Sequence, residues 1–293
     1  MSPSSELMPM LTLPNKATIS SLELVETPIT IIPFKSGEPI QGTRTIPCEV
    51  PVNLVYGGIP FAVMMATPAD LEDFAVGFSL SEGIIQNATE IRGVRIETEE
   101  RGLKIAVDLK PDRLHEHLAR RRVMSGRTGC GLCGIDDLNS LPQAKRPNGS
   151  APAISLEAIR KSLTMLESEQ ELNELTHAVH AAAWADLDGT IRYVREDVGR
   201  HCALDKLIGA LCRAGTKPNS GFVVVTSRCS FELVEKVATF GARTIIAISA
   251  PTSLALERAQ NLDVTLVGIA RRDSVTVFHG LERIHVQEML HEH

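Results

Sequence analysis

The chain has 293 residues, with 30 lysines and arginines against 36 aspartates and glutamates, and a formal net charge of −6. This acidic balance argues against a general nucleic-acid-binding protein, which would carry a basic excess. The sequence has neither a cationic segment followed by an apolar leader nor a stretch apolar enough to span a membrane. We therefore expect a cytoplasmic protein of two domains, with its six cysteines reduced, that binds a small molecule or another protein.

The first half predicts a flexible tail at 1–20 and an α+β domain at 21–123. Thr67 is placed to cap a helix whose first residue is Pro68, and Gly83 is placed to end it. The alternation of apolar and polar residues predicts strands at 22–25, 29–32, 94–97 and 103–107, a hairpin of 52–55 with 61–65 around Gly57-Gly58, and a second helix at 112–122.

Residues 124–150 have little periodicity and much Gly, Pro and Asn, so we expect a mobile loop with a function. It contains a C-x-x-C, Cys130 and Cys133, with glycines before, inside and after it. An exposed thiol near Arg127 should ionise more easily than a buried one. Three uses are open at this point: half of a metal site, a dithiol redox couple, or a sulfur relay. We expect Cys48, Cys212 and Cys229 to be structural or incidental.

The second half, 151–293, predicts an α/β domain. Ser155 starts a helix, and an antiparallel hairpin turns at Asp188-Gly189. Short apolar runs joined by helices predict a parallel sheet that is covered on both faces. The expected strands are 222–225, 244–248 and 264–269, and the expected helices are 203–213, 231–240 and 254–261.

Ligands of open α/β sheets bind beyond the carboxyl ends of the parallel strands. The segments at that edge carry hydroxyls and arginines beside helix N-termini, which favours a phosphate. The alternative is that Ser and Thr only cap helices and that the arginines are solvated. The candidate residues are Thr226, Ser227, Arg228, Ser249, Thr252 and the run Ala270, Arg271, Arg272, Asp273.

The charged segment 195–201 directly precedes a predicted helix. It is either a network of ion pairs or a loop in which Arg200 or His201 contacts an anionic ligand. A zinc site would need His177 and His180 together with Cys130 and Cys133. Residues three apart in a strand point to opposite faces, so we expect no metal site.

The chain contains four distinctive motifs, Leu71–Phe78 with Ser81–Ile85, Thr128–Gly134, Val194–Lys206 and Ser249–Ala255. Together these motifs resemble the FdhD family of formate dehydrogenase accessory proteins. The resemblance implies a sulfur carrier that takes sulfur from a cysteine desulfurase and delivers it to the molybdenum cofactor, a bis-molybdopterin guanine dinucleotide, before its insertion into formate dehydrogenase. It also implies a cytidine-deaminase-like fold, a three-layer α/β/α sandwich, for the second half.

The same resemblance implies the roles of individual residues. It places the persulfide on Cys130, with Cys133 assisting, and makes GDP a surrogate for the cofactor. The cofactor-binding stretch is Ile269, Ala270, Arg271, Arg272, Asp273 and Ser274, which lacks the glycines usual in the family. The expected partners are the desulfurase and the formate dehydrogenase catalytic subunit, and a homodimer is possible. The alternatives are a cofactor-binding chaperone and a dithiol oxidoreductase, neither of which transfers sulfur.

Overall fold

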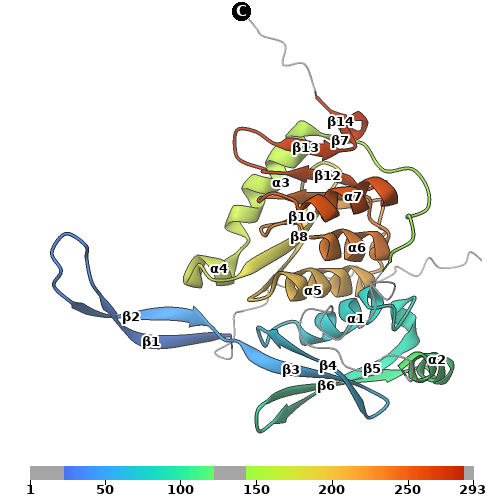
Figure 1. Ribbon diagram of the computed structural model, residues 1–293, viewed down its shortest axis with the longest axis horizontal. Helices are drawn as coiled ribbons and strands as arrows, with labels where there is room; N and C mark the ends of the chain where they lie inside the picture. Colours follow the sequence, from blue (N-terminus) through green and yellow to red (C-terminus); the bar gives the residue numbers. More distant parts are fainter. Residues whose placement is uncertain (1–22, 122–142, 287–293) are drawn as a thin grey trace, which may run out of the picture.

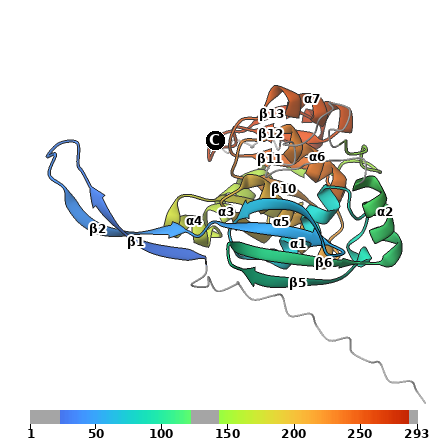
Figure 2. The ribbon, with the colours of Figure 1, turned by 60° about the horizontal axis from the view of Figure 1, so that its bottom comes forward.

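The computed structural model describes residues 23–121 and 143–286. Its first feature is a long antiparallel hairpin, here called the arm, which extends away from the rest of the molecule (Figure 1, Figure 2). The sequence predicts two short strands where the arm has one continuous strand that includes Pro28. A strand with a free edge accommodates proline, because it does not need every N–H for pairing. The arm consists of β1 (Leu24–Ile31) and β2 (Ile40–Pro47).

A four-stranded sheet of order β4-β3-β6-β5 follows the arm. The predicted hairpin around Gly57 and Gly58 is confirmed, and both glycines have positive φ, which costs glycine little. Alternate side chains of the sheet, such as Leu54 and Ile105, are buried against helix α1. The elements are β3 (Val50–Tyr56), β4 (Ile59–Ala66), α1 (Leu71–Ser81), the 3-10 helix η1 (Ala88–Glu90), β5 (Ile91–Glu99), β6 (Gly102–Leu109) and α2 (Pro111–Arg121).

Helix α1 begins at Leu71, so the predicted cap at Thr67 is wrong. The backbone N–H of Thr67 instead donates to Asp197 Oδ2 at 3.0 Å, and its hydroxyl accepts the N–H of Val198 at 3.2 Å. A residue type that suits a cap is therefore used in a contact between distant segments. Asp70 takes the N-cap position, and Gly83, with φ 66°, follows the helix end as predicted.

The second half forms a six-stranded sheet of order β13-β12-β11-β10-β8-β9. Only β10, β11 and β12 are parallel to one another, so the sheet is mixed rather than wholly parallel. The helices that follow its strands lie close to the helices predicted at 203–213, 231–240 and 254–261. In chain order, the first elements of the second half are β7 (Ile154–Ser155), α3 (Leu156–Ser168), α4 (Glu171–Thr176), β8 (His180–Asp186), β9 (Ile191–Asp197) and α5 (Arg200–Arg213). They are followed by β10 (Gly221–Val225), α6 (Phe231–Phe240), β11 (Thr244–Ala247), α7 (Ser253–Leu262), β12 (Thr265–Gly268), β13 (Thr276–His279), η3 (Leu281–Arg283) and β14 (Ile284–His285).

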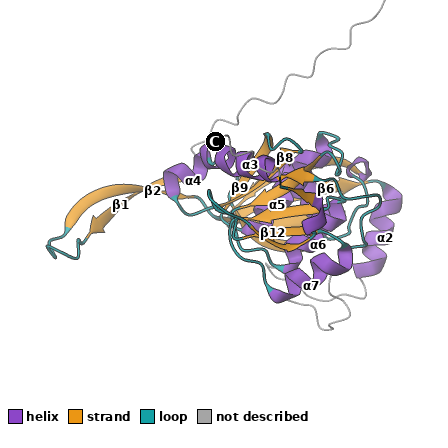
Figure 3. Cartoon of the chain, turned by 90° about the horizontal axis from the view of Figure 1, so that it is seen from above, coloured by secondary structure: helices purple, strands orange, loops and turns teal. Residues whose placement is uncertain are grey.

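Helices cover both faces of this sheet (Figure 3). Alternation along the strands sends Val223 and Ile245 toward α5, α6 and α7, and sends Val224 and Ile246 toward α3. The predicted covering of both faces is therefore confirmed. No helix in the two described ranges combines the length and the apolar character needed to cross a membrane.

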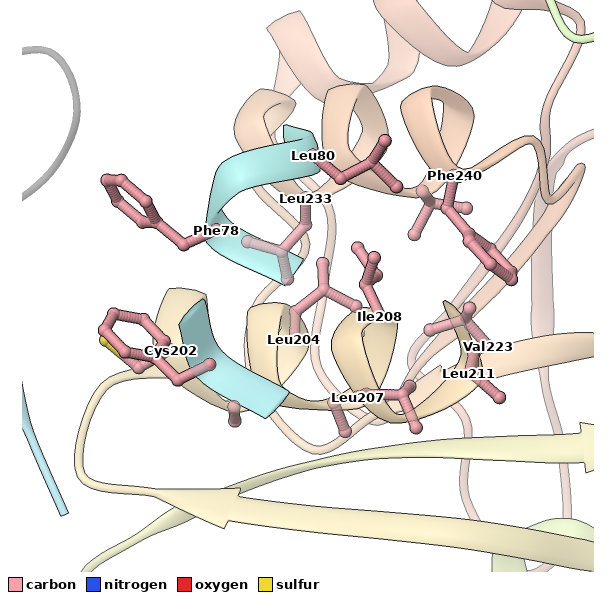
Figure 4. Close-up of a cluster of buried hydrophobic side chains, with 14 of the residues drawn as sticks. Phe78, Leu80, Cys202, Leu204, Leu207, Ile208, Leu211, Val223, Leu233 and Phe240 are labelled. Carbon is pink, nitrogen blue, oxygen red and sulfur yellow. The ribbon is translucent and has the colours of Figure 1, made fainter. Parts of the chain in front are cut away.

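Helix α1 lies directly on α5, and this contact joins the two sheets into one hydrophobic cluster. Leu80 of α1 and Leu204, Ile208 and Leu233 of α5 and α6 lie in one buried cluster between the helices (Figure 4). The ring of Phe78 points away from these leucines and packs against Phe61 and Phe74. The predicted domains at 21–123 and 151–293 thus share a core in the described part of the chain. The first half of the chain therefore packs directly against helices that cover the second sheet.

Residues 143–150, here called the strap, are bonded to α6, α7 and their flanks. The N–H of Ala144 donates to Glu235, Arg146 pairs with Asp263, and Arg243 donates to the carbonyl oxygens of Pro147 and Gly149. The sequence predicts a mobile loop over 124–150, and the structure shows that its last part is fixed. Cys130 and Cys133 lie outside the described residues.

Candidate functional site

The three predicted strand-end segments meet at one edge of the second sheet. The N–H of Cys229 donates to the carbonyl of Ala250 at 3.3 Å, and that of Thr252 donates to the carbonyl of Cys229 at 3.0 Å. The N–H of Ile269 donates to the carbonyl of Ser249 at 3.1 Å. Thr226–Arg228, Ser249–Thr252 and Ile269–Ser274 therefore form one continuous surface, because the parallel strands β10, β11 and β12 end side by side.

Most hydroxyls at this edge serve the fold. Thr226 Oγ1 accepts the N–H of Ala181 at 2.9 Å, Thr252 caps α7 by accepting the N–H of Ala255 at 3.2 Å, and Ser227 donates to the carbonyl of Arg228 at 3.1 Å. The capping alternative is therefore right for Thr252. These side chains shape the edge, and the groups that remain for a ligand are mainly guanidinium and imidazole.

The arginines of the edge differ in what they contact. Arg228 is exposed. Arg271 is also exposed, and its Nη1 donates to the carbonyl of Ile248, which holds it along the edge. Arg272 forms a two-pronged pair with Glu167 at the end of α3, at 2.6 and 3.1 Å. Arg272 is thus directed to the α3 side, so we separate it from the other candidates. The neighbouring Asp273 accepts the hydroxyl of Ser274 at 3.2 Å.

Ile269 directly follows β12 and has φ 50°. A β-branched residue in the left-handed region is strained, and such strain is concentrated at functional sites. The sequence predicts that Ile269 continues the strand, but the structure turns the chain here so that Ala270 is buried while Arg271 faces solvent. Ile269 therefore stays a candidate site residue.

The charged segment 195–201 is not a loop before a helix. Arg195, Glu196 and Asp197 belong to β9, and α5 already begins at Arg200. The ion-pair alternative holds for the strand residues, because Arg195 pairs with Asp73 at 2.7 Å and Asp197 pairs with Lys206 at 2.7 Å. Glu196 accepts two backbone N–H groups at 2.8 and 2.9 Å.

Arg200 and His201 are left at the first turn of α5, on the same sheet edge. Arg200 Nε is buried and has no hydrogen-bond partner among the described residues. A buried donor without a partner is costly, so a ligand that accepts from it would be stabilised. Burial, and then the positive charge of Arg200, lower the pKa of His180 at the start of β8. His180 therefore belongs to this cluster, which the sequence did not predict.

Glu232, in the first turn of α6, connects the cluster to the β10 segment. His201 Nε2 lies 3.2 Å from Glu232 Oε2, and the hydroxyl of Ser230 donates to the same oxygen at 2.7 Å. Burial alone would raise the pKa of Glu232, but the hydrogen bonds from His201 and Ser230 and the charges of His201 and Arg200 hold it at about 2. Glu232 is thus ionised and fixes the position of His201.

The helices α5, α6 and α7 all begin at this edge, each after one of the segments described. Their free N–H groups and their dipoles make the edge favourable for an anion. Together with Arg200, Arg228 and Arg271, they give it the chemistry of a phosphate-binding surface.

Three of the cysteines that the structure describes are poor nucleophiles, because burial disfavours the thiolate. Burial raises the pKa of Cys229 to about 12 and that of Cys212 to about 11, and it also raises the pKa of Cys202 well above its ordinary value. Cys48 is half-buried. Cys130 and Cys133 lie outside the described residues, and their role as the reactive pair stays a prediction.

His177 and His180, the two histidines considered for zinc, differ in setting. His177 is the C-cap of α4 with φ 53° and is exposed, while His180 is half-buried in β8. Within the described ranges no three His, Cys, Asp or Glu side chains are grouped so that they could hold a metal ion.

Comparison with known proteins identifies the family. The model of the FdhD/NarQ family matches residues 47–285. The chain belongs to the FdhD/NarQ family. The match begins at the last residue of β2 and includes both sheets and the sheet edge described above.

Relatives in this family carry the name sulfur carrier protein FdhD. That of Cupriavidus necator is 44% identical over 259 residues, with 88% of each chain covered. That of Bordetella petrii is 44% identical over 239 residues, covering 82% of this chain and 86% of the relative. A formate dehydrogenase accessory protein from Desulfotalea psychrophila has the same fold, with a TM-score of 0.68 at 24% identity, over 90% of this chain and 100% of its own.

Proposed function

We propose that this protein is a sulfur carrier that supports formate dehydrogenase maturation. It takes sulfur from a cysteine desulfurase as a persulfide on Cys130 and passes it to the bis-molybdopterin guanine dinucleotide form of the molybdenum cofactor. The observation that carries the proposal is the family match over residues 47–285, which includes both cysteines of the C-x-x-C and the anion-favouring sheet edge. The relatives named sulfur carrier protein FdhD support it.

Thiol exchange gives the first step. The thiolate of Cys130 attacks the sulfane sulfur of the donor persulfide, a new S–S bond forms, and the donor cysteine leaves as its thiolate. The Cys130 persulfide then presents its terminal sulfur to the cofactor. Cys133 can assist by attacking the Cys130 sulfur, which releases hydrosulfide and leaves a Cys130–Cys133 disulfide, so the two electrons come from the thiol pair. This chemistry needs reduced thiols, which fits the cytoplasm.

The cofactor is the cargo, and we propose that its guanine nucleotide end binds at the sheet edge. Arg200, Arg228 and Arg271 would contact the diphosphate there, and the N-termini of α5, α6 and α7 would add N–H donors. The unpartnered Nε of Arg200 supports its role in particular. GDP should serve as the surrogate ligand.

Mass spectrometry after incubation with a cysteine desulfurase and cysteine tests the sulfur step. We expect an adduct with the mass of one sulfur atom on the peptide of Cys130, removed by dithiothreitol and lost in Cys130→Ala. Cys48→Ala is the matched control and should keep the adduct. An adduct confined to Cys48, Cys202, Cys212 or Cys229 would contradict the proposal.

Titration calorimetry with GDP tests the nucleotide site. Arg200→Gln, Arg228→Ala and Arg271→Ala should each lose about 1.5–3 kcal/mol of binding free energy, the range for hydrogen bonds to charged groups, or roughly tenfold to a hundredfold in affinity. Arg272→Ala is the control, because Glu167 already holds that guanidinium on the α3 side. If all four variants bind GDP with the same affinity, the nucleotide binds at another surface.

The half-buried His180 offers an independent readout of where the phosphates lie. The charge of Arg200 contributes to lowering its pKa, so a bound diphosphate should raise the pKa of His180 by offsetting that charge. Arg200→Gln should raise it without GDP. A titration of the His180 ring protons by NMR that GDP does not change would argue against binding beside Arg200.

The two alternatives predict different outcomes. A cofactor-binding chaperone would bind GDP and still activate formate dehydrogenase in a Cys130→Ala variant. A dithiol oxidoreductase would cycle between dithiol and disulfide with a small thiol reductant and would need no desulfurase. The sulfur carrier loses activation in Cys130→Ala while it retains GDP binding.

A further inference from the structure

His201 is held by Glu232 through one of its two ring nitrogens. Nε2 lies 3.2 Å from Glu232 Oε2, and the two side chains are only 14% and 16% exposed. Burial would raise the pKa of Glu232, but its hydrogen bonds hold it at about 2, so the carboxylate has no proton to donate. The hydrogen between the two atoms therefore belongs to Nε2. Nδ1, on the other side of the ring, has no hydrogen-bond partner among the described residues and is left for a ligand.

Ser230 fixes the same carboxylate. It occupies the N-cap position of α6, where a serine hydroxyl ordinarily accepts an N–H of the first turn. Its hydroxyl makes no such bond and instead donates to Glu232 Oε2 at 2.7 Å. Thr252, at the N-cap of α7, does accept the N–H of Ala255, at 3.2 Å. Ser230 therefore serves the pair of His201 and Glu232 rather than the start of α6.

The charges that the protein itself places around His201 nearly balance. Glu232 of α6 favours a proton on the ring, whereas Arg200, the preceding residue of α5, disfavours one. A ligand with two negative charges would therefore decide the balance. The other charged or titratable groups near this cluster are His180 of β8, the exposed Arg228 of the β10 segment, and the buried pairs of Asp197 with Lys206 at 2.7 Å and Asp205 with Lys236 at 2.9 Å.

We propose that a diphosphate bound at this edge places a second proton on His201, and that Nδ1–H then donates to a phosphate oxygen. Glu232 is the positioning residue, because it holds the ring by Nε2 and leaves Nδ1 for the anion. The proton comes from solvent when the ligand binds and returns to solvent when the ligand leaves. This proton uptake rests on the nucleotide site proposed above and makes that site sensitive to pH.

Two physical effects favour the protonated ring in the complex. An opposite charge within about 4–6 Å stabilises the charged form of a titratable group. An imidazolium also donates from both ring nitrogens, so it can bond to the carboxylate of Glu232 and to a phosphate at the same time. With Nε2–H facing Glu232, a neutral ring would present only the lone pair of Nδ1 to the phosphate, and two acceptors repel each other.

The complex then holds one proton more than its free components, so raising the pH should weaken binding. Linkage of one proton limits the loss of affinity to about tenfold per pH unit. Histidine ordinarily changes its charge between about pH 5 and 8. The affinity should thus fall roughly five- to tenfold between about pH 6.5 and 8.

Titration calorimetry with GDP-mannose, in two buffers that differ in their enthalpy of ionisation, counts the protons taken up per ligand bound. Both phosphates of GDP-mannose are diesters whose charge stays fixed, whereas the terminal phosphate of GDP itself titrates at about pH 6. We expect the wild type to take up roughly half a proton or more at about pH 7.5. His201→Gln should take up none, and its affinity should not fall with pH. His115→Gln, exposed on α2, is the matched control and should equal the wild type.

Glu232→Gln separates the charge from the position. Its amide oxygen can still accept from Nε2, but the charge that stabilises an imidazolium is gone, so the proton uptake should fall below half of the wild-type value. An NMR titration of the wild type needs no variant. With GDP-mannose bound, the ring protons of His201 should report the protonated form up to a higher pH than without it.

Three results would overturn the proposal while GDP-mannose still binds and the nucleotide site stands. The first is an affinity that does not change with pH, and the second is equal proton uptake in His201→Gln and the wild type. The third is an uptake that His180→Gln abolishes, because the proton would then reside on His180. A wild type that does not bind GDP-mannose at any pH overturns the proton uptake together with the nucleotide site.

Discussion

Gly77 of α1 and Gly209 of α5 let the two helices touch backbone to backbone. A Cβ on Gly77 would lie 1.8 Å from the carbonyl oxygen of Asp205, and a Cβ on Gly209 would lie 1.8 Å from the carbonyl oxygen of Asp73. Each glycine thus faces the helix that carries the other. The contact joins the two halves of the chain and fixes α5, whose first turn carries Arg200 and His201.

Gly77→Ala and Gly209→Ala should therefore destabilise the fold through overpacking, by about 1–3 kcal/mol or more. The atoms in the way belong to backbone and cannot rotate aside, so the helices have to separate. Urea unfolding measures the loss. Gly93→Ala is the matched control, because a Cβ there meets nothing within 4 Å. Equal stability of the Gly77 and Gly93 variants would contradict the close contact.

The ion pair of Lys206 with Asp197 is fully buried, with Nζ 2.7 Å from Oδ2. Lys206→Met leaves a buried carboxylate without its partner and should cost about 3–5 kcal/mol of unfolding free energy. The double variant with Asp197→Asn should recover part of that loss, because no unpaired charge remains. Lys161→Met breaks an exposed pair with Asp188 and should cost under about 1 kcal/mol. A similar cost for both lysine variants in urea unfolding would refute this prediction.

Glu232 gives a prediction for the dependence of stability on pH. Its pKa is lowered from 4.5 to about 2 in the folded protein, so the unfolded chain binds the proton more readily. The stabilising effect of Glu232 is thus fully present above pH 4.5 and is lost as the pH falls toward about 2. Glu232→Gln should lower stability at neutral pH, and its difference from the wild type should shrink across that window. Unfolding curves at a series of pH values measure it, and a constant difference would count against the assignment.

Ile269 is strained, and a glycine in its place should relieve the strain. The left-handed conformation costs an L-residue roughly 1–2 kcal/mol, while glycine loses about 0.5–1 kcal/mol through its flexible unfolded state. Ile269→Gly should therefore leave the thermal stability equal or slightly higher. Ile96→Gly, at a strand residue of similar exposure, should lower it. A loss in Ile269→Gly as large as that in Ile96→Gly would show that the side chain matters more than the backbone.

The sequence predicted those elements whose signal is local. The alternation around Gly57 and Gly58 predicted the hairpin of β3 and β4, and short apolar runs predicted β10, β11 and the helices between them. The carboxyl edge of these strands followed from topology, so Thr226, Ser249 and Arg271 were expected together before any contact was known. Their role in binding stays a prediction.

The sequence could not predict features that distant residues decide. Thr67 has the type of a helix cap, but Asp197, 130 residues away, takes its N–H, so α1 begins later. The sequence places Arg195 in a possible ligand loop, yet it lies in β9 and its guanidinium bonds to Asp73 of α1.

Local patterning by itself predicted most of the elements, because propensity and periodicity act between near neighbours. It also marked the C-x-x-C and the carboxyl edge of the second sheet as candidate sites, and their roles stay predictions. Tertiary structure alone decided which charges were left free. Asp73, Asp197 and Glu167 pair with Arg195, Lys206 and Arg272, and the Nε of Arg200 is left buried without a partner among the described residues. Pairing of charges depends on distances between segments far apart in the chain, and only the folded arrangement of α1, α5 and the second sheet sets those distances.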